Sequence, residues 1–336
     1  MIPGGWDGGK GKTSLITGGW EGAVRCTVVG AGVMGLSCAW RLHEAGHDVR
    51  LVADLAPGAT TSAVAAAIWY PYLAAPRERV VGWGATTYDV LTGLAAEEPS
   101  AGIRLLAGVE VFSSTQPDPW WSAAVPDLRR LSAEERPAGL ADGWTFTTPV
   151  VDMPVYLAWL RGRLAARGID LVGQHVANLD DELAAVDVVI NCTGLGSRDL
   201  VGDEQLEPVR GQVVVLTNPG VSSWWLHDAG PDELTYVVPR LDTLVVGGTA
   251  DRGAADLTPG PAVAAAILAR ATDLVPAIAR ARVLAHQVGL RPVRPEIRLE
   301  REHRPGGAIV HCYGHGGAGV TLSWGCADEV VELVNR

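Results

Sequence analysis

The chain has 336 residues, enough for about two domains and a large core. Its 38 acidic and 27 basic residues give a net charge of −11, without a basic cluster interleaved with aromatics, which argues against nucleic acid and acidic membrane surfaces as partners. Apolar runs such as 261–269 fall well short of the roughly 18 residues that a membrane span needs. The five cysteines, an odd number without C-x-x-C spacing, indicate reduced, buried thiols in a cytoplasmic protein.

Residues 1–23 are rich in Gly, Lys and Thr and lack the apolar core of a signal peptide. We expect a flexible N-terminal extension there. Gly11-Lys12-Thr13 is similar to the end of a P-loop, but Trp6 stands where the first glycine of that motif should be. No nucleotide site is therefore predicted in this segment.

The first strong motif follows a short apolar run at 25–29. Residues 30–35 read Gly-Ala-Gly-Val-Met-Gly and lead into a helical pattern, and a second strand at 49–53 ends at Asp54, nineteen residues after Gly35. This spacing, within a strand–helix–strand unit, is typical of dinucleotide binding. The glycines let a pyrophosphate approach backbone N–H groups, and Asp54 would accept hydrogen bonds from ribose hydroxyls.

Small and hydroxylated residues then run into an aromatic sequence, Trp-Tyr-Pro-Tyr at 69–72. Either a ligand-contacting surface or a plain buried loop-to-helix segment would explain the stretch 57–72. Residues 76–96 are predicted to be helical, and 97–150 to form a mixed α+β insert.

Two further glycine turns follow apolar strands. The run 187–192 ends in Thr193-Gly194, and the run 308–312 leads through the glycine-rich segment 313–321 into a helix over 320–334. Because the carboxyl ends of parallel strands meet at one edge of a sheet, a single ligand would explain all three turns. The predicted helix after the last turn points N–H groups and its positive dipole end toward that ligand.

Between these turns the pattern changes. Runs at 212–216, 235–238 and 243–246, separated by turn residues, indicate an antiparallel sheet, and a helix is predicted at 261–274.

Arg291 and Arg294 each precede a proline, which disfavours the helical conformation and holds them extended. A fixed guanidinium suits bidentate binding of a carboxylate. The alternative is an edge strand whose arginines pair with neighbouring glutamates. That alternative is favoured for Arg298 and Arg301 and stays open for Arg291.

Together these motifs resemble the D-amino-acid oxidase family of flavoenzymes, which also includes D-aspartate oxidases. The match runs from about residue 25 to the end, and the arginine–proline run and the closing glycine turn are specific to the family. The segments that carry the resemblance are 28–37, Ala53-Asp54, Trp69-Tyr70-Pro71-Tyr72, Asn191-Cys192-Thr193-Gly194, Arg210-Gly211-Gln212, 289–295 and Tyr313-Gly314-His315-Gly316-Gly317.

The resemblance implies an α/β fold, α+β overall, with a discontinuous Rossmann-like FAD-binding domain and a substrate domain built on a curved, mixed or antiparallel sheet. Residues 24–72, 140–204 and 281–336 would form the FAD-binding domain. Residues 73–139 and 205–280 would form the substrate-binding domain.

It also implies oxidative deamination of neutral D-amino acids to 2-oxo acids, ammonia and hydrogen peroxide, by hydride transfer to non-covalent FAD and reoxidation by O2. Carried over by position, Arg291 would bind the substrate α-carboxylate, the Tyr236 hydroxyl would add a hydrogen bond, and the Gly317 carbonyl would accept from the amino group. No metal is implied. The implied FAD-binding residues are Gly30, Gly32, Val33, Met34, Gly35, Asp54, Thr60, Thr61, Ala66, Ala67, Val176, Thr193, Gly194, Gly316, Gly319, Val320 and Thr321.

The sequence departs from the family pattern at three places. Some relatives carry a lid tyrosine four residues before the position of Tyr236, where this chain has Asp232, so lid gating is not expected. Ala67 replaces a glycine common in the segment that lines the flavin, so contact there would be looser. Relatives that act on acidic substrates carry an arginine after a Gly-Gly-Thr segment, where this chain has Ala250 and Asp251. This favours neutral substrates, although His227 and Arg240 leave an acidic D-amino acid open.

Two other readings remain open at this point: an FAD oxidase of glycine, sarcosine or similar amines, and a flavin-binding module without turnover. A homodimer is likewise left open.

Overall fold

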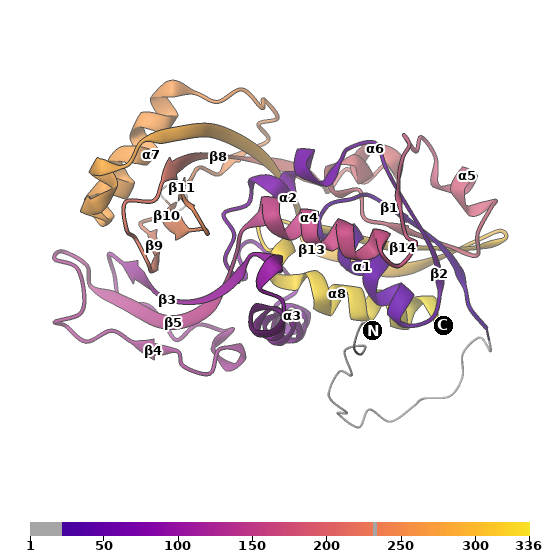
Figure 1. Cartoon of the computed structure of the whole chain (residues 1–336), viewed down its shortest axis with the longest axis horizontal. Coiled ribbons are helices and arrows are strands. Elements are labelled where there is room, and N and C mark those ends of the chain that lie inside the picture. Colours follow the sequence, from indigo (N-terminus) through magenta and orange to yellow (C-terminus); the bar gives the residue numbers. More distant parts are fainter. Residues whose placement is uncertain (1–21, 231–233) are drawn as a thin grey trace, which may run out of the picture.

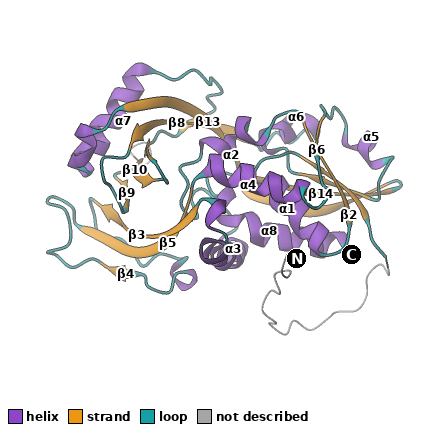
Figure 2. Cartoon of the chain, viewed as in Figure 1, coloured by secondary structure: helices purple, strands orange, loops and turns teal. Residues whose placement is uncertain are grey.

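The computed structural model describes residues 22–230 and 234–336, so nearly all of the extension predicted at 1–23, and Asp232 at the position of the lid tyrosine, lie outside the described residues. The described residues form two lobes joined by long strands (Figure 1). One lobe carries the N-terminal strands and the helices α1, α4 and α8, and the other carries α7 and most of the antiparallel strands (Figure 2). Within these residues, no helix combines the length and apolar character that crossing a membrane requires.

The first lobe is built on parallel strands, whose order in the sheet is β14, β7, β1, β2, β6. They are buried between layers, and β1 exposes only its first residue, as expected for a parallel strand covered on both faces. Their bounds are β1 Arg25–Val29, β2 Asp48–Ala53, β6 Leu171–Gly173, β7 Val188–Asn191 and β14 Gly307–His315.

The remaining strands extend the same sheet into the second lobe, in the order β4, β5, β3, β9, β10, β11, β8, β13. Strands β8 to β11 pair antiparallel, which confirms the prediction for this region, whereas β3 pairs parallel with β9. Their bounds are β3 Ile103–Phe112, β4 Arg129–Arg130, β5 Asp142–Val151, β8 Glu207–Thr217, β9 Trp224–Asp228, β10 Leu234–Pro239, β11 Thr243–Gly247, β12 Asp251–Arg252 and β13 Val283–Arg304.

Helices cover both lobes. α8 packs against α1 and α3 around the largest core cluster, and α7 covers the antiparallel strands β8, β10 and β11. The bounds are α1 Val33–Glu44, α2 Thr61–Val64, α3 Arg77–Glu97, α4 Met153–Ala165, α5 Leu179–Leu183, α6 Ser197–Leu200, α7 Pro261–Leu274 and α8 Gly319–Val334.

Strand β13 joins the two parts of the sheet. It pairs with β8 through Val293, and it pairs with β14 at Val293 and again from Arg298 onward, with a register shift between these two residues. Its two prolines fall around this crossover, and Pro292 stands opposite Pro208. Because the ladder is already interrupted there, the missing N–H donors cost little. The arginine–proline run is therefore extended as predicted, inside a longer strand.

This division between a parallel and a largely antiparallel part is compatible with the two discontinuous domains expected above, whose boundaries stay a prediction. The strand predicted at 308–312 continues to His315, because β13 pairs with it as far as that residue.

The contact between α3 and α8 depends on a missing side chain. A Cβ on Gly325 would lie 2.4 Å from the backbone of Trp83, so we expect Gly325→Ala to reduce the free energy of unfolding by roughly 1–3 kcal/mol. Gly82 on α3 has nothing within 4 Å of the same position, and Gly82→Ala should raise stability by about 0.5–1 kcal/mol. Urea unfolding of both variants tests the contact. Equal effects would contradict it.

Candidate active site

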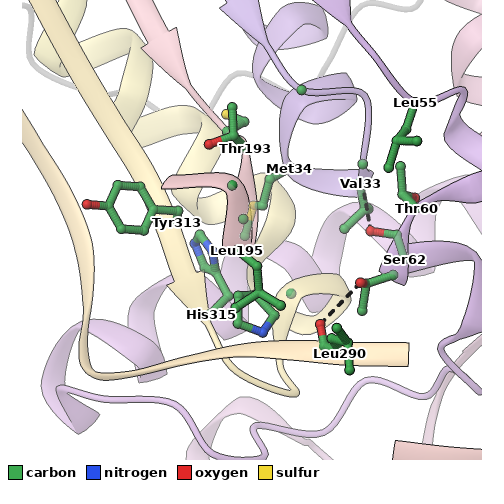
Figure 3. A pocket seen from close by; sticks show the side chains of 18 of the residues that line it. Val33, Met34, Leu55, Thr60, Ser62, Thr193, Leu195, Leu290, Tyr313 and His315 are labelled. Atoms are coloured by element: carbon green, nitrogen blue, oxygen red, sulfur yellow. Dashed lines mark hydrogen bonds between the residues drawn. The ribbon is translucent and has the colours of Figure 1, made fainter. Parts of the chain in front are cut away.

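A cavity of about 640 Å³ lies at the carboxyl edge of the parallel strands. The turns that follow β1, β2, β7 and β14 all contribute to its wall, and Figure 3 shows Val33, Leu55 and Thr193, from three of these turns, around it. The glycine turns near residues 30, 194 and 316 therefore meet at one cavity, as their recurrence in the sequence predicts.

The first turn is shaped by contacts that exclude side chains. Gly30 has a φ of +112°, and a Cβ on it would lie 2.5 Å from the carbonyl oxygen of Cys192. Gly32 occupies the N-cap of α1 and offers no side-chain acceptor, while the Val33 N–H donates to Ser62 Oγ at 3.1 Å (Figure 3). The N-terminus of α1 thus presents its positive dipole end to the cavity, as an anion site requires.

A buried polar network orders the second turn. Asn191 Oδ1 accepts from the backbone N–H and the hydroxyl of Thr193, at 3.2 and 2.8 Å. Asn191 Nδ2 donates to His311 Nδ1 at 3.3 Å, and His311 Nε2 donates to Glu302 at 2.8 Å. Burial lowers the pKa of His311, with Glu302 opposing this shift, so a neutral imidazole protonated on Nε2 fits both contacts.

The closing turn is held against the segment that follows the aromatic sequence. Gly316, with a φ of +56°, donates its N–H to the carbonyl oxygen of Pro292 at 2.8 Å, and a Cβ on it would lie 2.2 Å from the carbonyl oxygen of Leu73. A Cβ on Gly317 would lie 2.5 Å from Cδ1 of Tyr72. Gly317 remains exposed to the cavity, and α8 begins two residues later without a side-chain cap.

Arg291 reaches the cavity from β13. Its Nη1 donates to the carbonyl oxygen of Thr249 at 2.8 Å, its Cζ lies 5.9 Å from the ring centroid of Tyr72, and a Cβ on Gly211 would meet its guanidinium at 2.6 Å. Within residues 22–230 and 234–336, no carboxylate lies within ion-pair distance of it. A positive charge held without a carboxylate partner is suited to an anionic ligand.

Tyr236 lies beside this guanidinium. Burial raises the pKa of its hydroxyl, and the charge of Arg291 opposes the shift. Cβ atoms on Gly247 and Gly248 would lie 2.3 and 2.7 Å from its ring, so the bare backbone of β11 makes room for the tyrosine. The hydroxyl stays protonated at neutral pH and can donate a hydrogen bond.

Most of the residues implied by the resemblance line this cavity. They include positions implied for the cofactor and the three implied for the substrate, whose roles stay a prediction. The lining residues among them are Gly30, Gly32, Val33, Met34, Asp54, Thr60, Thr61, Val176, Thr193, Gly194, Gly316, Gly319, Val320, Arg291, Tyr236 and Gly317.

Four implied residues lie behind the lining, and each has a structural contact there. A Cβ on Gly35 would overlap the Gly30 carbonyl, and the Ala66 carbonyl accepts from Arg240 at 2.8 Å. The backbone of Ala67 pairs with that of Val151. The Thr321 hydroxyl accepts from the N–H of Tyr70 and donates to its carbonyl. Their role as FAD contacts stays a prediction.

Other lining residues were not predicted. Ser62 belonged to the hydroxylated stretch, and its position opposite the α1 N-terminus could have been proposed from that pattern. Gln174 and His175 follow β6, a strand of only three residues that leaves no clear sequence signal, and His175 Nδ1 lies 3.5 Å from Asp54. Tyr313 and His315 lie within the closing motif.

The chemistry of this cavity fits FAD. The N-termini of two helices face the cavity, where they could hold phosphate and an electron-poor ring system. Asp54 offers a hydrogen-bond acceptor for a ribose, and the volume of the cavity is in the range of cofactor pockets. The glycine contacts at Gly30 and Gly316 keep side chains out of this space.

A family model described as FAD dependent oxidoreductase matches residues 25–333. The chain belongs to this family. It is 50% identical over 311 residues to a protein of Rubrobacter xylanophilus named D-amino-acid oxidase, covering 92% of this chain and 95% of the relative, and 46% identical to one of the same name from Streptomyces coelicolor, covering 92% and 96%. The solved glycine oxidase of Geobacillus kaustophilus has a TM-score of 0.77 at 21% identity, covering 94% of this chain and 95% of that one, which supports the fold.

These findings confirm three predictions: the flavoenzyme family, FAD as the cofactor, and a mixed α/β fold. The family membership also makes the protein an FAD-dependent oxidoreductase rather than a binding module.

The second lobe contains a buried carboxylate. Glu110, on β3, is 3% exposed and accepts a hydrogen bond from the hydroxyl of Tyr70. Burial raises the pKa of Glu110 to about 7; Asp228 adds to this shift and the Tyr70 hydroxyl opposes it. The protein therefore holds a titratable carboxylic acid among aromatic side chains.

We expect Asn191→Ala to weaken FAD binding, because the Thr193 turn loses its acceptor and His311 its partner. A lost buried hydrogen bond costs roughly 1–3 kcal/mol, so the Kd for FAD should rise about tenfold or more. Asn218→Ala is the matched control, since Asn218 caps the turn after β8 through two backbone N–H groups and lies away from the cavity. Fluorescence titration of apoprotein measures both. An unchanged Kd in Asn191→Ala would contradict the role.

We expect Glu110→Gln to change the pH dependence of stability. The pKa of Glu110 in the folded state lies above its ordinary value of 4.5, so its protonated form favours the folded protein. This contribution to the free energy of unfolding is fully present below about pH 4.5 and is lost as pH rises through about 7. The glutamine side chain of the variant does not titrate, so its stability does not fall with pH in this way. Relative to the parent, the variant should gain roughly 2–3 kcal/mol between pH 5 and pH 8 in urea unfolding. A difference independent of pH would refute the shift.

Proposed function

We propose that the protein oxidises neutral D-amino acids to imino acids, with non-covalent FAD as the hydride acceptor and O2 as the final oxidant, which is reduced to hydrogen peroxide. Hydrolysis of the imino acid by water then gives the 2-oxo acid and ammonia. The observation that carries this proposal is the guanidinium of Arg291, which has no carboxylate partner among the described residues and lies beside the Tyr236 hydroxyl in the cavity that Gly317 also lines. The names of the two relatives above support the substrate class.

The cofactor would be held by the turns described above. The N-terminus of α1, with the N–H groups of Gly32 and Met34, would receive the pyrophosphate, and Asp54 would receive the ribose. The turns at Thr193 and Gly316 would hold the rest of the cofactor, with the N-terminus of α8 favouring negative charge near the ring system. When bound, FAD supplies the hydride-accepting chemistry, and the protein supplies orientation and electrostatics.

Three groups would orient the substrate. The two terminal nitrogens of Arg291 bind the α-carboxylate, the Tyr236 hydroxyl donates to the same carboxylate, and the Gly317 carbonyl accepts from the amino group. With the carboxylate and the amino group fixed, only one enantiomer would direct its Cα–H bond toward the bound cofactor. Holding the reacting atoms in this way lowers the barrier without a side-chain base.

The preference for a neutral side chain is supported by two contacts. Asp251 pairs with Arg210 at 3.2 Å. Arg240, which could have bound a side-chain carboxylate, donates instead to the carbonyl oxygens of Ala65 and Ala66, at 2.7 and 2.8 Å. Oxidation of glycine or sarcosine is less favoured, because the relatives that are 50% and 46% identical are both named D-amino-acid oxidase.

We also propose a cytoplasmic location for this chemistry. All five cysteines are free and buried, which suits a reducing compartment.

We expect Arg291→Met to remove roughly 2–5 kcal/mol of carboxylate binding, seen as a fall in kcat/KM for D-alanine, because the Tyr236 hydroxyl alone cannot compensate the carboxylate charge. Arg282→Met, a change of an exposed arginine just before β13, should have little effect. Steady-state oxygen consumption measures both. Activity of Arg291→Met within a few-fold of the parent would refute the assignment.

The proposed function itself is tested by a peroxide-coupled screen of D- and L-amino acids, glycine and sarcosine. Neutral D-amino acids should give the highest kcat/KM. Peroxide formation only from glycine or sarcosine, or only from L-amino acids, would overturn the proposal.

A further inference from the structure

Three cysteines from separate elements converge in the first lobe and form what we call the thiol cluster. Cys38 lies on α1, Cys192 directly follows β7, and Cys312 lies on β14. The last backbone pair between β14 and β7 joins His311 to Asn191, so Cys312 and Cys192 are the next residues along two neighbouring strands. Cys192 Sγ lies 3.8 Å from Cys38 Sγ, and the three sulfurs lie within 4.8 Å of one another.

The spacing of these sulfurs is that of ligands sharing one metal ion. The centre of three sulfurs at such separations lies about 2.2–2.8 Å from each of them, and a Zn–S bond is about 2.3 Å long. Buried thiols can also pack simply as small apolar side chains. Such packing, however, does not require three sulfurs to meet around one point, whereas metal binding does.

The donor atoms select a soft cation. All three ligands of the thiol cluster are sulfurs, which favour thiophilic ions such as Zn²⁺, whereas Mg²⁺ and Ca²⁺ favour oxygen. His315 Nε2, 3.9 Å from Cys312 Sγ, lies close enough to share an ion with that sulfur and offers a fourth ligand. A buried thiolate is costly without a cation, so the ion would stabilise the same thiolates that bind it.

The thiol cluster is reached from the cofactor cavity. Cys38 and Cys312 are 0% and 1% exposed, and Cys192 is 8% exposed. Cys192, Cys312 and His315 line the cavity, while Cys38 lies behind them. An ion therefore has its path to the sulfurs through the space that FAD fills.

We infer that the thiol cluster binds one soft, thiophilic metal ion, with the three sulfurs and His315 Nε2 as ligands, and that the ion enters only while the cofactor cavity is empty. The cofactor-free protein is then the form that captures such ions, and bound FAD protects the thiols from them. This inference does not depend on which substrate the protein oxidises.

Cadmium titration of the full-length, cofactor-free protein tests the site, with a phosphine keeping the thiols reduced. The probe is Cd²⁺, whose thiolate complexes show a sulfur-to-metal charge-transfer band in the ultraviolet. The band should saturate at one Cd²⁺ per chain with the intensity of three thiolates. Zn²⁺ should displace Cd²⁺, and Mg²⁺ should not. In FAD-saturated protein the band should form roughly a hundredfold more slowly or not at all.

Cys38→Ala should weaken Cd²⁺ binding roughly a hundredfold or more and lower the band to that of two thiolates. Cys26→Ala is the matched control. Cys26 is another buried thiol, but it pairs with Val188, at the end of β1 and β7 away from the cavity, and its Sγ donates to the Val24 carbonyl. This control should bind Cd²⁺ like the parent. If Cys38→Ala does not fold, X-ray absorption of the Cd²⁺-loaded parent counts the sulfur ligands directly.

The outcomes separate the site from its entrance. No charge-transfer band in the cofactor-free protein, fewer than three sulfurs around Cd²⁺, or an unchanged affinity in Cys38→Ala would overturn the metal site. A band that forms equally fast with and without FAD would overturn entry through the cavity, while the site itself would stand.

Discussion

The structure depends on the close approach of backbone at the closing glycine turn. At Gly316 and Gly317 a side chain of any kind would overlap the segment containing Tyr72 and Leu73, so only glycine brings the two segments into contact. That contact sets α8 with its N-terminus at the cavity and leaves Gly317 on the wall that Arg291 and Tyr236 also line. Under the proposed function, the same turn would serve the cofactor with its N–H groups and the substrate with its carbonyl oxygen.

Charge distribution then decides what the cavity accepts. The guanidinium of Arg291 is held by a backbone carbonyl and an aromatic ring instead of a carboxylate, so its charge remains available to an anionic group. Glycines at positions 211 and 247 give Arg291 and Tyr236 the space they occupy.

The sequence predicts the elements whose signals are local. The strand at Arg25–Val29, the helix at Pro261–Leu274 and the three glycine turns follow from hydrophobic period and turn chemistry over a few residues. The convergence of those turns follows from a general rule for parallel sheets. The absence of an acidic partner at Arg291 does not, because its neighbours come from β8, the residues just after β11 and the aromatic segment, far apart in the chain.

Details that depend on tertiary contacts were also beyond the sequence. Thr321 and Ala67 are turned toward Tyr70 and Val151, and the parallel pairing of β3 with β9, which aligns Glu110 with Tyr236, has no local signature.

The central claim is that this cavity orients a D-amino acid for hydride transfer to FAD, and anaerobic mixing of the FAD-loaded protein with single substrates tests it most directly. D-alanine should bleach the flavin absorbance near 450 nm at a rate at least an order of magnitude higher than L-alanine or sarcosine does. Such a difference is expected if the orientation of the substrate is the source of the rate. Bleaching by L-alanine or sarcosine at a comparable rate, or none by D-alanine while FAD remains bound, would contradict the account.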